Sequence, residues 1–281
     1  MRRLRFALLL LLPAAAAADP PTDLRQVREY FKAKYPTLRL DDYSNGVTAL
    51  PGNNRRAGSE LAAPALERAL AQGRKEWRTP FKNGKTYASC FVNDGKNVAQ
   101  HYPYWHDISR MVRTAEMDLI DCLKKNGEAR LFTTADPATN AEARTALANL
   151  TAAFYELSAN QLVDIDLSEA EAIAAYEEGK RYWWARRGRL NLACADCHMG
   201  KAGKPEAGAV RASAALGHPV AWPAYRMSVG GLETIHQRYT QCNLRIGAKP
   251  EPLGSRVYNH LQIYQTYLSS GVPLSAPAVR D

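Results

Sequence analysis

Long apolar runs are scarce in this chain of 281 residues, and their scarcity limits how the protein could meet a membrane. The one extended run covers residues 6–12 and is far shorter than the roughly 20 residues that a membrane-spanning helix needs. No later stretch approaches that length. The sequence therefore predicts no transmembrane segment.

The first 18 residues have the three parts of a secretory signal. Arg2, Arg3 and Arg5 precede the apolar run, and a tract of small residues ending at Ala18 follows it. No cysteine follows this segment closely, which argues against a lipoprotein anchor. We therefore expect residues 1–18 to be a signal peptide that is cleaved after Ala18, and the mature protein to lie in the periplasm.

Runs of lysine and arginine with interleaved aromatic residues, which are typical of nucleic-acid-binding proteins, are also missing. The formal net charge of +9 includes the three signal arginines, so the mature chain carries about +6. A basic surface on an exported protein favours anionic substrates or acidic protein partners. A solvated surface with no specific partner is the alternative, and we expect no nucleic-acid partner.

Cysteine is rare, with five in the chain, and two of the five form a short motif. Cys194-Ala-Asp-Cys197-His198 is the C-x-x-C-H pattern that attaches a c-type haem. Each thiol bonds one vinyl group, and the histidine gives the iron an axial nitrogen. A redox C-x-x-C site is one alternative; zinc is another, but it needs further ligands and no second Cys/His pair exists. We predict one covalently attached haem c.

Weak matches between the two halves of the chain indicate an internal duplication. Gly73 and Gly179 lie 106 residues apart in similar contexts, and Cys90 and Cys197 lie 107 apart. Further pairs in the same order are His101-x-x-x-Trp105 with His218-x-x-x-Trp222, Arg110-Met111 with Arg226-Met227, and Cys122 with Cys242. Several matches at a nearly constant offset favour two tandem cytochrome c-like domains.

In the first copy the haem motif is lost. The positions that match C-x-x-C-H read Tyr87-Ala-Ser-Cys90-Phe91, so neither thioether attachment nor proximal ligation is possible there. Cys90 and Cys122 match positions that face the haem in the other copy. Without a porphyrin these two thiols can approach to disulfide distance, about 5.5 Å between Cα atoms. We predict that a Cys90–Cys122 disulfide stabilises a haemless domain. Two buried free thiols are the alternative.

Helical spacing of apolar residues supports a mainly α fold. It extends over residues 23–35, 61–78, 108–125, 141–158, 167–186, 231–244 and 256–270, and there is little strand signal. The periodicity lapses over residues 159–167. We therefore predict a haemless cytochrome c-like domain over residues 19–160 and a haem-binding cytochrome c domain over residues 161–281.

The second axial ligand of the haem iron is the feature that best distinguishes the possible functions. Met227 would give a plain electron-transfer cytochrome, since a thioether raises the reduction potential. Its match Met111 persists in the haemless copy, which favours a packing role. Cys242 is the odd cysteine once the haem and the disulfide have each used two, and it matches Cys122. We favour Cys242 as the ligand and keep Met227 as the alternative.

Arg238 lies one helical turn before Cys242, so both side chains are expected on one helix face. A guanidinium there stabilises a thiolate and presents a fork of donors to an oxyanion. A surface arginine without a role is the alternative. A haem-bound cysteine beside an arginine indicates chemistry on an anionic oxo-sulfur compound.

With these motifs the sequence resembles the SoxA subunits of the SoxAX cytochromes over nearly the whole mature chain, on C-x-x-C-H together with Arg238-Tyr-Thr-Gln-Cys242-Asn243. Tyr87 and Phe91 place it with the monohaem form. The resemblance implies Cys194 and Cys197 as thioether sites, His198 and Cys242 as iron ligands, Cys242 also as the persulfide-bearing active cysteine, and Arg238 as a substrate contact.

The activity that the resemblance implies is L-cysteine S-thiosulfotransferase. Thiosulfate is joined oxidatively to a cysteine of a SoxYZ-like carrier protein, with electrons leaving through haem c to a SoxX-like monohaem cytochrome subunit, with or without a third small subunit. A thiosulfate dehydrogenase that forms tetrathionate is the enzymatic alternative. That enzyme normally needs two haems, and this chain has one attachment site.

Overall fold

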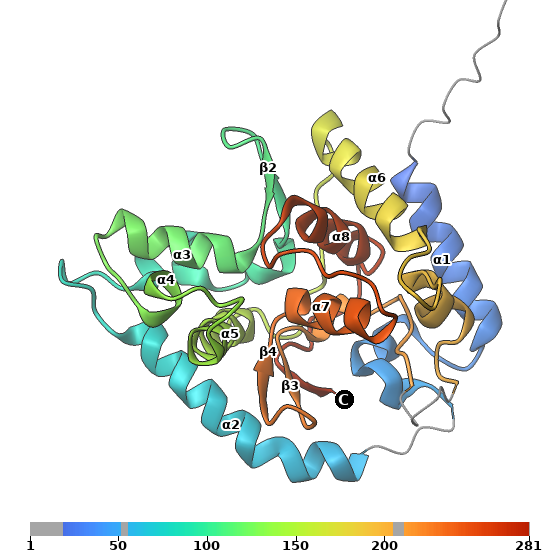
Figure 1. Ribbon diagram of the computed structural model, residues 1–281, viewed down its shortest axis with the longest axis horizontal. Helices are drawn as coiled ribbons and strands as arrows, with labels where there is room; N and C mark the ends of the chain where they lie inside the picture. The colour runs from blue at the N-terminus through green and yellow to red at the C-terminus, as the bar shows by residue number, and fades with distance from the viewer. Residues whose placement is uncertain (1–18, 52–55, 205–210, 281) are drawn as a thin grey trace, which may run out of the picture.

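The computed structural model describes residues 19–51, 56–204 and 211–280, so the predicted signal peptide lies outside the described residues (Figure 1). The fold is mainly helical, as predicted. The helices are α1 Pro20–Lys34, α2 Arg56–Arg78, α3 Ala115–Lys125, α4 Leu131–Thr134, α5 Ala141–Glu156, α6 Ala170–Trp184, α7 Ile235–Arg245 and α8 Arg256–Tyr267. Within these ranges no helix is both long and apolar enough to cross a bilayer.

Two small sheets were not expected from the sequence. Strands β1 (Tyr104–His106) and β2 (Met111–Arg113) form an antiparallel hairpin. A second hairpin, β3 (Ala224–Arg226) with β4 (Gly231–Glu233), is joined in parallel by β5 (Ala278–Arg280). Strands of three residues are too short to show a period of two. The helices predicted over 108–125 and 231–244 consequently begin later, after each hairpin.

The hairpin and the helix after it occur twice with one spacing. Every residue of β1, β2 and α3 has a counterpart 120 residues later in β3, β4 and α7. A cis X–Pro bond precedes each hairpin, at Pro103 and at Pro223. This spacing corrects the sequence pairing, because Met111 corresponds to Gly231 rather than to Met227. The inference that Met227 packs because Met111 persists therefore fails, and Met227 has to be judged from its own position.

A close helix crossing also occurs twice. At Gly73 of α2, an added Cβ would lie 2.0 Å from the carbonyl oxygen of Asn149 in α5. At Gly179 of α6, it would lie 1.9 Å from the carbonyl oxygen of His260 in α8. Only glycine allows two backbones to approach this closely. In each half of the chain two helices therefore lie side by side, α2 beside α5 and α6 beside α8 (Figure 1).

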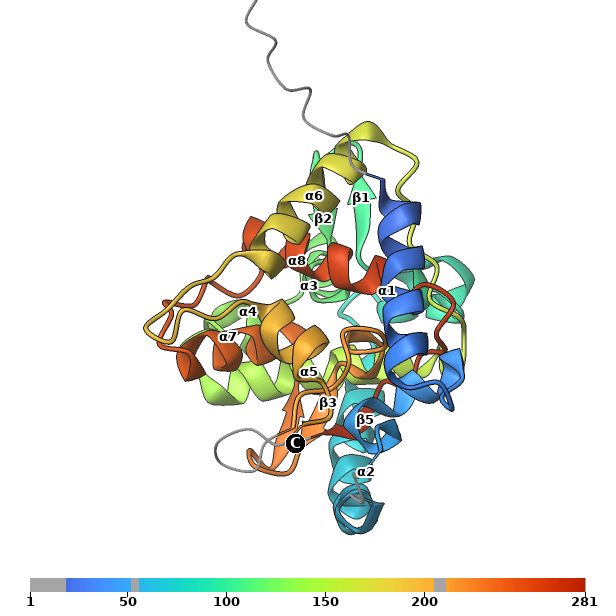
Figure 2. The same cartoon turned by 90° about the vertical axis from the view of Figure 1, so that its right-hand side faces the viewer.

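The first helix packs on the second half of the chain, beside α6 and α8 (Figure 2). Tyr30 Oη and Lys34 Nζ donate hydrogen bonds to the Met199 carbonyl oxygen, at 3.0 and 2.5 Å. Asp23 accepts from Lys180 Nζ at 2.9 Å. By these contacts α1 belongs with the half that carries the C-x-x-C-H motif, an arrangement that helical periodicity does not encode. The domain boundary near residue 160 stays a prediction.

One hydrophobic core runs through both halves. It includes Leu119 and Phe154 from the first half and Trp183 and Leu261 from the second. The Asn259 side-chain amide of α8 also donates to the Val112 carbonyl oxygen of β2 at 3.1 Å. The two halves are therefore packed together and not joined only by the chain between them.

Cys90 and Cys122 form the predicted disulfide, with their Cα atoms 5.8 Å apart and a sequence separation of 32. Because a bridge of this span restricts the unfolded chain, we expect the double variant Cys90→Ala/Cys122→Ala to lose about 3–4 kcal/mol of unfolding free energy. Urea unfolding of the oxidised protein and the variant measures the loss. The haem spectrum should not change, because the bridge lies in the other half; an unchanged urea midpoint would contradict the prediction.

Candidate functional site

A cavity of about 810 Å³ lies beside the C-x-x-C-H motif. Five predicted site residues line it together: Cys194, Cys197, His198, Arg238 and Cys242. The volume falls within the roughly 300–1,000 Å³ typical of small-molecule and cofactor sites. The disulfide lies elsewhere, in the first half. The structure thus brings together the residues predicted to hold haem and substrate.

The motif forms one wall through a short π-helical turn, η5 (Asp196–Gly200). The Asp196 carboxylate anchors this turn, since it accepts from the Ala193 N–H at 2.9 Å and pairs with Arg186 at 2.9 Å. His198 Nδ1 lies 3.0 Å from the Ser213 carbonyl oxygen. Donation from Nδ1–H to that carbonyl leaves the Nε2 lone pair for a metal, which is the usual arrangement of a ligating histidine.

Helix α7 forms a second wall and carries Arg238 and Cys242 one turn apart. Its start is fixed by a capping box in which Thr234 and Gln237 each bond the other's backbone. Two side chains tie α7 to α8: Tyr239 Oη donates to Gln265 Oε1 at 2.5 Å, and the Asn243 amide donates to Tyr258 Oη at 3.1 Å. The helix therefore holds the arginine and the cysteine on a rigid support.

The residues of the cavity fit a covalently held haem. Apolar side chains that line it are Trp183, Leu190, Leu192, Ile246 and Leu261. Two thiols at attachment spacing and an oriented histidine supply the donor set that a c-type haem requires. In the described parts of the chain no three His, Cys, Asp or Glu side chains are grouped to hold a bare metal ion, so the zinc alternative lacks ligands.

Met227, the alternative ligand, lies in the turn between β3 and β4. Its side chain is 39% exposed and does not line the cavity. Cys242 does line it and is unpaired. The position of Met227 therefore argues against thioether ligation, a conclusion that the mistaken pairing with Met111 could not provide.

From the sequence, His218 was noted as one residue of the repeat, and its place in the site was missed. It is buried, lines the cavity, and its ring centre lies 4.6 Å from that of His198. Its Nδ1 is 2.8 Å from Ser213 Oγ. Burial, together with the neighbouring His198 and Arg238, holds the pKa of His218 well below its usual value, so the ring is neutral at physiological pH. No ligand-like spacing in the sequence marked this histidine.

In the first half, aromatic rings fill the surroundings of Tyr87 and Phe91. Tyr87 is fully buried and stacks on Trp77 with ring centres 5.8 Å apart. Phe91 and Phe154 lie 4.8 Å apart, and Trp77 lies 5.7 Å from Phe154. Tyr87 and Phe91 thus belong to a packed aromatic core.

His236 of α7 should make the protein sensitive to acid. It is buried, it accepts a hydrogen bond from the Gly254 N–H at 3.1 Å, and burial lowers its pKa to about 4. An unfolded histidine titrates near 6.5, so the unfolded state binds the extra proton first. Stability should therefore fall by about 1.4 kcal/mol per pH unit between pH 6.5 and 4, and level off below.

Urea unfolding at several pH values tests this expectation. The variant His236→Asn should flatten the decline over that interval, whereas His101→Asn, at an exposed histidine, should not. An equal decline in both variants would show that other groups cause it.

The fold and the cavity define a c-type cytochrome. The profile of the family described as SoxA/TsdA, cytochrome c domain, matches residues 72–163. The L-cysteine S-thiosulfotransferase subunit SoxA of Allochromatium vinosum is 35% identical over 268 residues, covering 94% of this chain and 91% of that protein. The protein of the same name from Chlorobaculum thiosulfatiphilum is 34% identical and covers 95% and 92%. The chain belongs to the SoxA family, as its motifs had indicated.

A solved structure supports the fold. The crystal structure of SoxXA from P. pantotrophus matches with a TM-score of 0.67 at 19% identity, covering 81% of this chain and 84% of the solved one. At this identity the match concerns the fold alone. The family profile, which describes a cytochrome c domain, agrees with a covalently bound haem c.

Proposed function

We propose that this protein is the haem-bearing catalytic subunit of a periplasmic thiosulfate-oxidising complex, with L-cysteine S-thiosulfotransferase activity. One observation carries the proposal: Arg238 and the unpaired Cys242 line the same cavity as the C-x-x-C-H motif. Relatives that are 34–35% identical over more than nine tenths of the chain are named for this activity.

Four side chains hold the cofactor in this proposal. Cys194 and Cys197 would hold the haem through two thioether bonds, and His198 and Cys242 would ligate its iron. The chain carries one haem c, because Tyr87 and Phe91 leave the first half without an attachment site. Bound haem c supplies a one-electron acceptor, and a SoxX-like cytochrome subunit supplies the second acceptor that a two-electron oxidation needs.

The side chains of the cavity perform the sulfur chemistry. Arg238 orients the thiosulfate dianion by donating to its sulfonate oxygens, and its charge favours the thiolate of Cys242. The outer sulfur of thiosulfate forms a bond to the Cys242 sulfur, with loss of two electrons and of the thiol proton. A carrier thiolate then attacks the outer sulfur, takes the sulfane-sulfonate group and releases Cys242.

The charge of the cavity suits these partners. Basic side chains that line it are Arg187, Lys201, Lys204, Arg238 and Arg245. A cationic opening attracts both a dianionic substrate and an acidic protein surface. The partners that we propose are a SoxX-like monohaem subunit, a SoxYZ-like carrier whose cysteine accepts the product, and thiosulfate; a signal peptide cleaved after Ala18 would export the chain to them.

We also propose that the chain arose by duplication, with a haemless first domain and a haem-binding second domain. The common spacing of 120 residues between the hairpin–helix units supports this origin. So do the matching glycine crossings at Gly73 and Gly179. The cytochrome c profile, moreover, covers residues 72–163, the half that has no C-x-x-C-H motif.

A reconstituted reaction tests the function. The holoprotein, its SoxX-like partner and a SoxYZ-like carrier are mixed with thiosulfate and an acceptor cytochrome c. We expect acceptor reduction together with a carrier whose intact mass has increased by one thiosulfate group. Reduction with tetrathionate as the product and an unchanged carrier would instead indicate a thiosulfate dehydrogenase, and no reduction at all would contradict both.

A further inference from the structure

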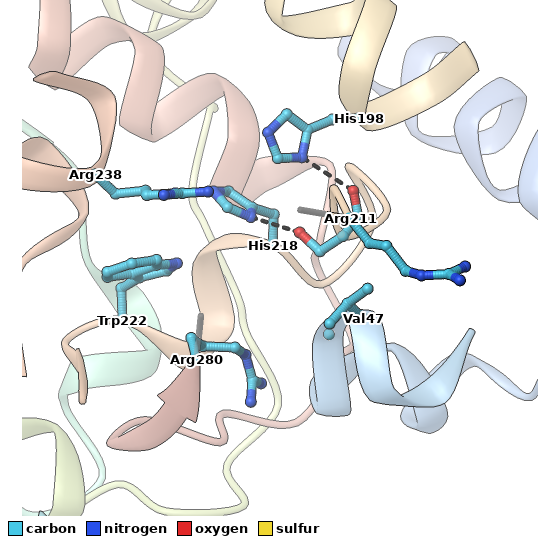
Figure 3. Close-up of a pocket in the computed structure, with 9 residues that line it drawn as sticks. Val47, His198, Arg211, His218, Trp222, Arg238 and Arg280 are labelled. Atoms are coloured by element: carbon cyan, nitrogen blue, oxygen red, sulfur yellow. Dashed lines mark hydrogen bonds between the residues drawn. The ribbon is translucent and has the colours of Figure 1, made fainter. Parts of the chain in front are cut away.

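A small cavity of about 30 Å³ adjoins the haem cavity, and its walls carry an excess of positive charge (Figure 3). Polar side chains that line it are His198, Arg211, Ser213, His218, Arg238 and Arg280, with no carboxylate among the lining residues. His198, His218 and Arg238 also line the haem cavity, so the two spaces share a wall. In Figure 3 the side chain of Arg238 extends toward His218.

Arg280 is the unexpected member of this group. It comes from strand β5, which pairs in parallel with β3 so that Arg280 lies beside Arg226. Its Nη2 donates to the Ser44 carbonyl oxygen at 2.6 Å, and its Nη1 donates to the Val279 carbonyl oxygen at 2.8 Å. Both acceptors are neutral. Arg280 is half-buried, and this burial lowers its pKa to about 10, with no carboxylate among its hydrogen-bond partners.

The absence of a counter-charge extends to Arg238. Among the described residues, no ion pair includes Arg238 or Arg280. The Arg238 guanidinium donates a hydrogen bond to a neutral group, Gln241 Oε1, at 3.5 Å. Taking a guanidinium out of water without an anionic partner is unfavourable, so two such groups at one cavity indicate a place for an anion.

The chain is shaped to bring Arg280 to this place. Gly46 adopts φ +62°, and a Cβ there would lie 2.8 Å from Arg280 Nε. Glycine removes both the conformational cost and the clash. The backbone turn at Gly46 thus leaves room for the guanidinium of Arg280.

The size of the cavity selects the anion. A cavity needs about 10–15 Å³ to hold one water molecule. The small cavity, at about 30 Å³, therefore accommodates two or three atoms or groups of that size. A carboxylate has that size, whereas a free thiosulfate ion has five heavy atoms. A haem that is attached through its vinyl groups presents two propionate carboxylates at its opposite edge, and the shared wall gives one of them access.

We propose that Arg280, together with Arg238 and His218, binds a haem propionate in this small cavity. The proposal rests on the haem attachment of the proposed function and goes beyond it by assigning a binding role to the C-terminal strand. A guanidinium beside the propionate neutralises a negative charge close to the iron. It therefore favours the reduced state, and its loss should lower the reduction potential.

The test uses the full-length holoprotein without thiosulfate or partner proteins. Arg280→Gln removes the charge, Arg280→Lys keeps it with a different donor geometry, and Arg110→Gln removes an arginine that is exposed and paired with Glu171. We expect Arg280→Gln to shift the reduction equilibrium toward the oxidised haem by about tenfold, or 59 mV for one electron. Arg280→Lys should shift it less, and Arg110→Gln should leave it unchanged.

Resonance Raman spectroscopy of the propionate bending modes reports the contact directly, and these modes should move in both Arg280 variants. Unchanged propionate bands and an unchanged potential in both Arg280 variants would overturn the proposal. If Arg280→Gln does not fold, unmoved propionate bands in Arg280→Lys overturn it equally. Because these measurements need no transferase activity, a failure of the proposed enzymatic function would be seen separately.

Discussion

Replacement of Cys242 by serine is expected to abolish thiosulfate transfer while the haem stays attached through Cys194 and Cys197. The thiol lines the haem cavity one helical turn from Arg238, and serine cannot form the bond to the outer sulfur of thiosulfate. Removing a nucleophile typically costs three or more orders of magnitude in rate. We therefore expect carrier modification to fall at least about a thousandfold.

The measurement is the rate of carrier modification by intact mass, with haem content and absorption spectrum recorded for the same samples. The spectrum should change as well, since serine removes the proposed thiolate ligand. Met227→Leu is the matched control: its side chain is exposed outside the cavity, so both activity and spectrum should be retained. Turnover retained in Cys242→Ser, or an iron–thioether band lost in Met227→Leu, would contradict the assignment of Cys242.

Gly179→Ala should have the second largest effect, on the integrity of the haem half. The new Cβ would lie 1.9 Å from the His260 carbonyl oxygen, so α6 and α8 have to separate. These helices supply Trp183, Leu261 and Gln265 to the cavity wall. Overpacking against backbone has no flexible side chain to absorb it, and we expect a loss of about 3 kcal/mol together with poor haem incorporation.

Gly73→Ala provides the matched control in the other half. Its Cβ would lie 2.0 Å from the Asn149 carbonyl oxygen, a nearly identical clash between α2 and α5. Urea unfolding should show a similar destabilisation, whereas haem content and the Soret spectrum of the folded protein should remain normal. Equal haem loss in both variants would mean that the two halves do not fold around separate helix pairs.

Much of the site could be predicted because its chemistry is local in sequence. C-x-x-C-H places two thiols and a histidine on one turn, and the spacing of Arg238 and Cys242 places them on one helix face. Cysteine counting, aided by the repeat, also led to the Cys90–Cys122 disulfide, which the structure contains. In these cases the covalent or helical spacing itself limits where the side chains can be.

The helical class could be predicted as well, because long amphipathic segments such as 141–158 have a strong period. The three-residue strands could not, since so short a segment has no measurable period. In the proposed repeat, the register of the hairpin region was misjudged, with Met111 aligned to Met227. Identities between single residues in sequence gave offsets of 116 and 117, whereas strand pairing and helix bounds give 120.

The sequence by itself determined the class of cofactor and the pairing of Cys90 with Cys122, because a C-x-x-C-H motif and so few cysteines leave few alternatives. Only the tertiary structure decided which distant residues complete the site. His218 lies beside His198, α1 packs on the second half, and Arg280 reaches the small cavity from the C-terminal strand. These positions follow from long-range packing of helices and strands, and the free energy of such packing belongs to the whole core rather than to any local pattern.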